Sequence, residues 1–226
     1  MLAFTGFCAT VASGYHRAVF DPDTGDAPYL AEYGTMTWWP LRLRLASEAD
    51  LESVLRLIHS VAVWLQTQNT DQWARPWPNQ AVRDDRVRTD LKRGKTWIAW
   101  DGETAAATIT VDPDEDPRWP ELRYRHPAIY IQRLMICRPY GGAGLGAELL
   151  DWAGKSSRRD HQADWMRANA WTTNKRLHDY YTGQGFTSCG FCDAADGYPS
   201  AARFQRPAAY LSATHRGLLV EVSGTR

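Results

Sequence analysis

The sequence predicts an α/β fold, in which strands and amphipathic helices share one core. Three observations lead to this prediction. An apolar run over residues 129–137 is typical of a buried strand, and it passes through a glycine-rich loop into an amphipathic helix. Strand-like segments lie on both sides of Asp101-Gly102, a dipeptide that favours a tight hairpin. Apolar residues recur at helical spacing over residues 51–65.

The remaining elements can be justified in chain order. Alternating leucines predict a first strand, and Ser47 to Asp50 has the capping-box pattern that begins a helix. In the helix after the glycine-rich loop, Glu148 and Asp151 fall on faces away from the apolar stripe. The expected strands cover residues 38–46, 96–100, 104–111, 129–137 and 165–171. The expected helices begin near residues 47, 80, 145 and 174. The segments 66–80 and 113–127 are expected to be loops.

At 226 residues the chain suits one domain of ordinary size with short additions. Residues 1–36 contain glycine, proline and acidic turns with little periodicity, so we expect a loosely structured N-terminal extension there. The folded domain is expected to cover residues 37–207. Residues 208–226 are expected to form a C-terminal tail with no assigned role.

Composition excludes several classes of function. The 26 basic residues balance the 26 acidic ones, so net charge provides no attraction to nucleic acid or to an acidic membrane. No apolar run reaches the ~20 residues of a membrane span, and no Lys or Arg precedes the apolar residues 2–13, which favours a cytoplasmic protein over a secreted one. Cys189 and Cys192 form a single C-x-x-C pair with no second pair, so we expect reduced thiols and no metal site.

The segment 138–150 carries the strongest functional signal. Four glycines, at positions 141, 142, 144 and 146, lie where the buried strand turns into a helix. Glycine permits a positive φ and allows backbone N–H groups to approach a ligand closely. The start of a helix adds unpaired N–H donors and partial positive charge. The sequence therefore predicts a cradle for a phosphate or a pyrophosphate.

Several interpretations of the function of this glycine-rich loop are possible. A Walker loop fails because Gly146 is followed by Ala147-Glu148 instead of Lys-Ser or Lys-Thr. The dinucleotide fingerprint G-x-G-x-x-G/A is met by Gly142, Gly144 and Ala147, but only about half of a doubly wound domain fits in the residues that follow. A turn that binds no ligand would carry the backbone-entropy cost of four glycines without a reason.

A second motif lies about thirty residues further on. Residues 174–186 read N-x-x-L-x-x-Y-Y-x-x-x-G-F. Together with the glycine loop, this motif resembles the GNAT N-acetyltransferase family, whose loop reads Q/R-x-x-G-x-G/A. Gly144 and Gly146 fill the two glycine positions, whereas Gly141 stands where the family has Gln or Arg. The resemblance covers about residues 41–207.

The resemblance implies the GNAT acyl-CoA N-acyltransferase fold: a mixed, mostly antiparallel central sheet flanked by helices, with acetyl-CoA between two parallel strands that splay apart. It also implies a bulge, which fits the break in the apolar pattern at Gln132-Arg133. Tyr181 matches the family's tyrosine that protonates the sulfur of CoA. The residues expected to bind the cofactor are Leu134, Met135, Ile136, Gly141, Gly142, Ala143, Gly144, Leu145, Gly146 and Asn174. A plain N-cap role for Asn174 is an equal alternative.

The expected activity is transfer of an acetyl group from acetyl-CoA to a primary amine, on a small molecule or at a protein N-terminus or lysine, in a direct ternary complex. The alternative is a non-catalytic CoA-binding sensor or adaptor, because a fold does not guarantee activity. An amine-bearing acceptor is the expected partner. The sequence does not decide whether the protein forms a homodimer. Trp64, Trp73 and Trp77 could wall the acceptor pocket or fill the core. The candidate bases near the strand ends are Asp112, Asp114, Glu121 and His126, with an ordered water as the alternative. His178 lies in the late helix, where we expect it to be solvated at the surface.

Overall fold

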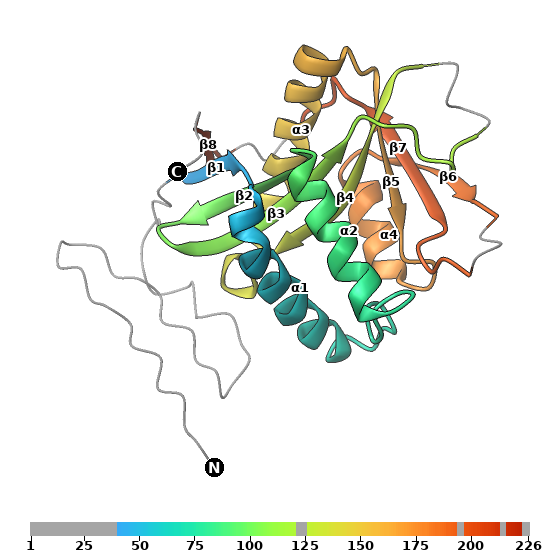
Figure 1. The fold of residues 1–226 in the computed structure, drawn as a ribbon. Coiled ribbons are helices and arrows are strands. Elements are labelled where there is room, and N and C mark those ends of the chain that lie inside the picture. The colour runs from blue at the N-terminus through green and yellow to red at the C-terminus, as the bar shows by residue number, and fades with distance from the viewer. Residues whose placement is uncertain (1–39, 121–125, 194–196, 213–215, 223–226) are drawn as a thin grey trace, which may run out of the picture. The chain divides into compact units, whose positions relative to one another are not determined.

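The computed structural model describes residues 40–120, 126–193, 197–212 and 216–222; the extension expected over residues 1–36 lies outside them. Within the described residues, eight strands form one sheet in the order β6-β7-β5-β4-β3-β2-β1-β8 (Figure 1). The strands are β1 Leu41–Leu45, β2 Thr96–Asp101, β3 Thr104–Asp112, β4 Ala128–Ile136, β5 Trp165–Ala170, β6 Thr187–Phe191, β7 Ala202–Pro207 and β8 Leu219–Glu221.

The sheet is mixed and mostly antiparallel, as expected. Only two of its neighbouring pairs are parallel, β4 with β5 and β1 with β8. The predicted hairpin joins β2 and β3 through Gly102, whose φ of 58° lies in the left-handed region that glycine tolerates. The central pairing β3–β4–β5 therefore brings the strand before the glycine loop next to the strand that follows its helix.

Helices cover both faces of the sheet (Figure 1). They are α1 Leu51–Gln66, α2 Gln80–Lys92, α3 Leu145–His161 and α4 Lys175–Gly183, with short 3-10 turns at η1 Glu48–Asp50 and η2 Arg138–Tyr140. On one face α1 and α2 pack in an apolar cluster that includes Met135 of β4. On the other face α3 packs against Ile129 and Ile131. The elements expected from periodicity are thus confirmed, with bounds that differ by a few residues.

Strands β4 and β5 pair only at their starts. Their register runs from Ala128 opposite Trp165 to Ile131 opposite Ala168, and then the pairing ends. At this point the β3–β4 register shifts, and Arg133 adopts a φ of 45°. The hydroxyl of Thr108 donates to the Arg133 carbonyl oxygen at 3.0 Å and holds the irregular backbone. The expected bulge at Gln132-Arg133 is confirmed, and it lies where the two parallel strands part.

Two acidic residues of α3 differ from their expected position. Glu148 and Asp151 are each 2% exposed, although their spacing placed them away from the apolar stripe. Glu148 accepts the backbone N–H of Arg216 at 2.5 Å and that of Leu218 at 2.7 Å, while Asp151 accepts both the N–H and the hydroxyl of Ser212. They are buried because the chain after residue 207 packs over this face of α3.

The sequence left the segment 208–226 without a role, and its described residues, 208–212 and 216–222, contribute to the fold. Ala208 and Leu218 are buried, and β8 pairs in parallel with the edge strand β1. This pairing places Arg216 close to the start of α3, where its guanidinium lies 3.5 Å from the Ala143 carbonyl oxygen. Within the described residues, no helix combines the length and the apolar character needed to cross a bilayer.

Candidate active site

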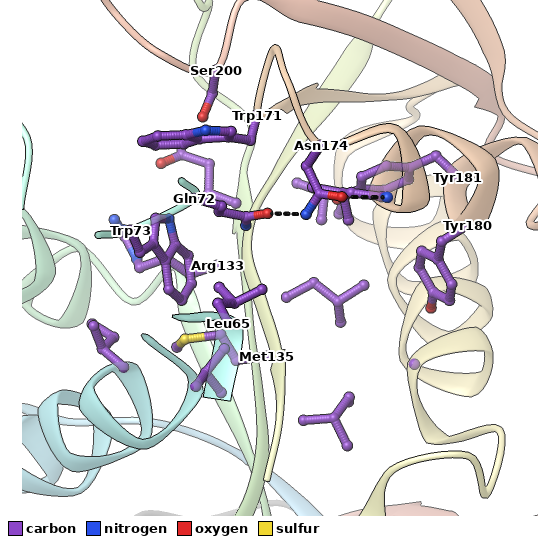
Figure 2. Close-up of a pocket in the computed structure, with 18 of the residues that line it drawn as sticks. Leu65, Gln72, Trp73, Arg133, Met135, Trp171, Asn174, Tyr180, Tyr181 and Ser200 are labelled. Atoms are coloured by element: carbon purple, nitrogen blue, oxygen red, sulfur yellow. Dashed lines mark hydrogen bonds between the residues drawn. The ribbon is translucent and has the colours of Figure 1, made fainter. Parts of the chain in front are cut away.

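A cavity of about 890 Å³ opens where β4 and β5 part (Figure 2). Its lining comes from the second half of β4, the glycine loop, the starts of α3 and α4, and the loop between α1 and α2. Nine of the predicted cofactor residues line the cavity: Leu134, Met135, Ile136, Gly141, Gly142, Gly144, Leu145, Gly146 and Asn174. The tenth, Ala143, is not part of the lining and packs against the hydrophobic core instead. Tyr181 lines the cavity as well.

The glycine loop has the backbone that its sequence predicts. Gly142 and Gly144 adopt φ values of 79° and 94°, and a β-carbon at either would meet no atom within 4 Å. Both glycines are therefore required for conformation and leave open space at the loop. Gly144 is the N-cap of α3 and no side chain caps the helix there, so the N–H groups of its first turn lack intrahelical partners. Tyr140 anchors the loop, because its hydroxyl donates to Asp101 at 2.6 Å.

The other two glycines are explained by close neighbours. A β-carbon at Gly146 would collide with the Tyr180 hydroxyl. A β-carbon at Gly141 would lie 3.0 Å from the Arg138 guanidinium and 3.1 Å from the Arg138 carbonyl oxygen. The guanidinium of Arg138 also stacks on Trp64 with 4.2 Å to the ring centroid. Arg138 thus holds a positive charge beside the position where the resembling family has Gln or Arg.

The second half of β4 presents a backbone edge to the cavity. Met135 and Ile136 pair with β3, through Thr108 and Ala107, on one side only. On the other side β5 has already parted from β4. The N–H and C=O groups along this edge are therefore placed to bind an extended ligand, as a new strand would.

The Tyr181 ring is buried in an aromatic cluster. It stacks on Phe204 with centroids 5.6 Å apart and meets Phe186 edge-on at 5.2 Å. Burial, with a smaller contribution from Tyr180, raises the pKa of Tyr181 well above its ordinary value, so its hydroxyl stays protonated. Burial also raises the pKa of Tyr180 to about 12. The structure brings both phenols to the cavity, whereas the motif pointed to Tyr181 alone.

Asn174 bridges two parts of the cavity wall. Its carbonyl oxygen accepts the N–H of Leu177 at 3.1 Å, which is the N-cap bond of α4, and its amide donates to Gln72 at 2.5 Å (Figure 2). Asp71 strengthens the same junction by accepting from Trp171 and Thr173. The loop between α1 and α2 is therefore tied to the start of α4. Its tryptophans Trp73 and Trp77, together with Trp64 of α1, all line the cavity.

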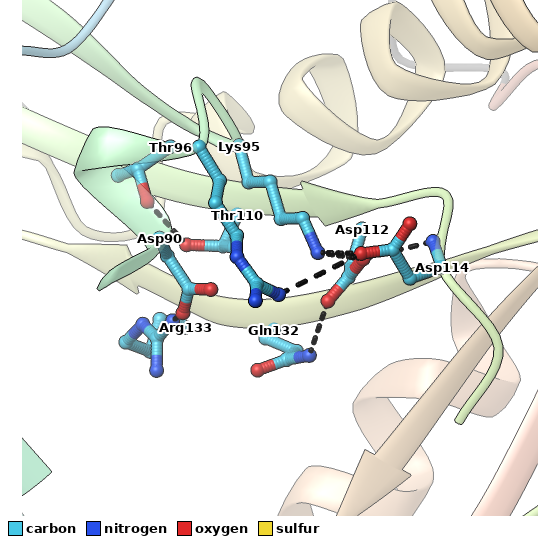
Figure 3. Close-up of polar contacts among 9 residues, drawn as sticks. Asp90, Lys95, Thr96, Thr110, Asp112, Asp114, Gln132 and Arg133 are labelled. Carbon is cyan, nitrogen blue, oxygen red and sulfur yellow. Dashed lines mark hydrogen bonds and ion pairs between the residues drawn. The ribbon is translucent and has the colours of Figure 1, made fainter. Parts of the chain in front are cut away.

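The candidate bases lie elsewhere. Asp112 and Asp114 each accept from Lys95 at 2.5 Å (Figure 3), and that bond lowers the pKa of Asp114. His126 packs on Trp165, and the Nε2 atom of His178 lies 2.9 Å from the Trp171 carbonyl oxygen. None of these four lines the cavity. Glu121 lies outside the described residues.

Sequence reasoning missed the charged residues that line the cavity, among them Arg138, Arg216 and Asp116. Asp116 is the one carboxylate among the described lining residues, and it accepts from Asn169 at 2.7 Å and from Arg118. Arg138 could have been predicted as a cavity residue, because it lies next to the glycine loop in the sequence. Arg216 and Asp116 reach the cavity through contacts that chain order does not reveal. In the part of the chain that the structure describes, no group of three or more His, Cys, Asp or Glu side chains could hold a metal ion.

A mixed sheet that opens between two parallel strands, beside a glycine loop at a helix start, defines an α/β protein whose cavity suits an extended ligand that carries a phosphate group. Residues 58–186 match the model of the acetyltransferase (GNAT) family. The chain belongs to the GNAT acetyltransferase family.

Similar proteins agree with this assignment. The chain is 25% identical over 145 residues, 62% of this chain and 78% of the relative, to the uncharacterized N-acetyltransferase YesJ of Bacillus subtilis. A GNAT-family acetyltransferase structure from Listeria monocytogenes matches with a TM-score of 0.59 at 18% identity, covering 73% of this chain and 93% of that one. The PaiA N-acetyltransferase of Thermoplasma acidophilum, solved in complex with coenzyme A, matches with a TM-score of 0.57 at 15% identity, covering 75% and 99%. At these identities the two structures support the fold.

Proposed function

We propose that the protein transfers the acetyl group of acetyl-CoA to a primary amine within a ternary complex. The observation that carries this proposal is the continuity of one cavity whose lining includes the glycine loop, the free edge of β4 and Tyr181. The complex of PaiA with coenzyme A supports the choice of donor.

The glycine loop and the first turn of α3 would bind the pyrophosphate of the donor through backbone N–H groups from Gly142 to Gly146. Arg138 would replace the missing side chain at Gly141 by placing its guanidinium near the phosphates, and Arg216 lies at the same loop. The edge of β4 over residues 134–136 would pair with the pantetheine arm and donate an N–H to the thioester oxygen as negative charge develops there.

In the reaction the amine nitrogen attacks the thioester carbon, the C–S bond breaks, and the sulfur leaves as a thiolate. Tyr181 would donate its proton to that thiolate. Burial raises the pKa of Tyr181, so the phenol holds its proton before the reaction. The same shift makes the phenol a weaker acid, so the transfer to sulfur would require that desolvation also raises the proton affinity of the thiolate beside it. The proton that the amine loses would pass to water in the cavity, and water would return one proton to the Tyr181 phenolate before the next turnover.

Two measurements test this proposal. Calorimetry should show that CoA binds, and thiol release from acetyl-CoA should increase when an amine panel is added. Absence of CoA binding would overturn the proposal. Binding without turnover on any amine would instead support the alternative of a CoA-binding sensor or adaptor.

A further inference from the structure

Positively charged side chains outnumber negatively charged ones in the part of the cavity that lies opposite the glycine loop, on the face of the sheet that α1 and α2 cover. Nine arginines line the cavity, whereas Asp116 is the only carboxylate among the described lining residues. Six of the nine come from the α1–α2 loop, α2, the loop after β3, and strands β4 and β5: Arg75, Arg83, Arg86, Arg118, Arg133 and Arg167. This part is the acceptor half of the cavity, since the donor occupies the side of the glycine loop in the proposed function.

Neighbouring carboxylates neutralise only half of these arginines. Arg83 pairs with Asp84, Arg118 with Asp116, and Arg133 with Asp90 (Figure 3). Burial lowers the pKa of Arg133 to about 10, which leaves its guanidinium charged at neutral pH. The other three, Arg75, Arg86 and Arg167, form no ion pair with any described residue.

Arg167 is the most informative of the three. Its side chain is 1% exposed, and Nη1 donates to the Tyr130 hydroxyl at 3.2 Å. Its Nε is buried with no hydrogen-bond partner among the described residues. The guanidinium lies 5.3 Å from the ring centroid of Trp119 and lines the cavity. A buried charge without a counter-ion is costly, and an anion that enters the cavity would relieve that cost.

Arg86 extends the positive surface toward solvent. It lies over the ring of Trp77 at 4.8 Å from the centroid, and Trp77 meets Tyr198 edge-on at 5.0 Å. Arg118 covers the same Tyr198 ring at 3.8 Å. These stacked guanidinium groups and rings form a rigid wall whose cations are held in place before any ligand binds.

We propose that the acceptor amine carries an anionic group, a carboxylate or a phosphate, which Arg167 and Arg86 bind. This inference rests on the proposed function. The arginines would also assist the chemistry, because nearby positive charge lowers the pKa of a bound amine and favours the neutral form that attacks. A polyamine or another acceptor with only positive charge would be repelled by the same wall.

Matched pairs of acceptors test the proposal. Phenylalanine and phenethylamine differ only in a carboxylate, and glucosamine 6-phosphate and glucosamine differ only in a phosphate. In the thiol-release assay the anionic member of at least one pair should have a kcat/KM about 10- to 100-fold higher. The pair that responds identifies which anion is recognised. Equal rates within both pairs would overturn the inference while leaving acetyl transfer intact.

Variants connect the preference to these arginines. Arg167→Met and Arg86→Met should each reduce the preference, which is the ratio of kcat/KM for the anionic and the uncharged acceptor, about 10-fold. Arg56→Met is the matched control, since Arg56 lies on α1 with a side chain that is 66% exposed. Arg86 is exposed, so its variant keeps the test valid if Arg167→Met fails to fold. A preference that survives both substitutions would contradict the inference.

Direct binding separates this inference from the proposed function. Calorimetry of phenylalanine and glucosamine 6-phosphate against the CoA-loaded protein needs no turnover. Binding that Arg86→Met weakens, without acetylation of any amine, would refute the proposed function and keep the anion site. Absence of both binding and turnover would refute the anion site.

Discussion

The guanidinium of Arg138 lies 3.0 Å from the point where a β-carbon at Gly141 would stand. Relative to the loop motif of the family, the side chain at position 141 is replaced by that of Arg138, which reaches forward from η2, three residues earlier in the sequence. The exchange keeps a positive charge at the loop although the expected Gln or Arg is missing. It also explains why glycine suits position 141, whose φ of −65° any residue could adopt.

The first prediction concerns this exchange. Arg138→Met should weaken CoA binding about 10-fold, because a charge-assisted contact to a phosphate is lost. Gly141→Arg alone should bind CoA poorly, since its β-carbon meets Arg138. The double variant Arg138→Ala/Gly141→Arg should recover part of the affinity by restoring a guanidinium at the loop. Calorimetry with CoA measures all three, and a double variant no better than Arg138→Met would contradict the explanation.

The elements that local spacing encodes were predictable. Apolar periodicity located α1 and α3, the Asp101-Gly102 turn located the β2–β3 hairpin, and a single break in an apolar run located the bulge of β4. In each of these cases the determining residues lie within about one turn or one strand of each other. The glycine loop was predictable for the same reason, because positive φ values are required locally at Gly142 and Gly144.

Features that depend on distant contacts were not predictable. Glu148 and Asp151 are polar residues whose burial depends on partners 61 to 70 residues away in the sequence. The charge of the acceptor half arises from arginines on five separate segments, while the whole chain has no net charge. Periodicity reports which face of a helix is apolar, and it contains no information about which distant segment covers the other faces.

Tyr181 provides the second prediction. Tyr181→Phe should reduce kcat about 100-fold or more and change CoA affinity little, because the proton donor is lost while the ring packing remains. Tyr180→Phe is the matched control on the same helix, and it should affect kcat far less. Comparable loss of kcat and CoA affinity in Tyr181→Phe would remove Tyr181 from this role.

The third prediction concerns pH. An unperturbed phenol has a pKa of ~10 and would lose its proton in mildly alkaline solution. Burial raises the pKa of Tyr181, so the phenol stays protonated to higher pH and the proton donor is retained. At saturating substrate, kcat should therefore show no alkaline decline that depends on Tyr181 up to about pH 10. A decline centred near pH 10 in the wild type that is absent from the residual activity of Tyr181→Phe would contradict this.

The fourth prediction concerns stability. Glu148→Gln should destabilise the fold by about 2 kcal/mol, because a buried carboxylate that accepts two backbone N–H groups is replaced by an amide with one acceptor oxygen. For a protein of this size that corresponds to a fall in Tm of about 4–8 °C. Glu52→Gln is the control, since the Glu52 side chain is 72% exposed and its loss should change Tm by less than about 1 °C. Equal melting temperatures for the two variants would show that the contacts of Glu148 do not hold the C-terminal segment.

The final prediction separates backbone strain from ligand binding at the glycine loop. Gly144→Val should abolish CoA binding and leave the fold intact, because a β-branched residue resists the φ of 94° that aims the first N–H groups of α3 at the ligand. Gly102→Val imposes comparable strain, with a φ of 58° in the β2–β3 turn and open space around it, but it lies outside the cavity lining. The two variants should lose similar amounts of Tm, measured by thermal melting, whereas calorimetry should detect CoA binding only in Gly102→Val. If Gly144→Val bound CoA as tightly as Gly102→Val does, the phosphate cradle would not lie at this loop.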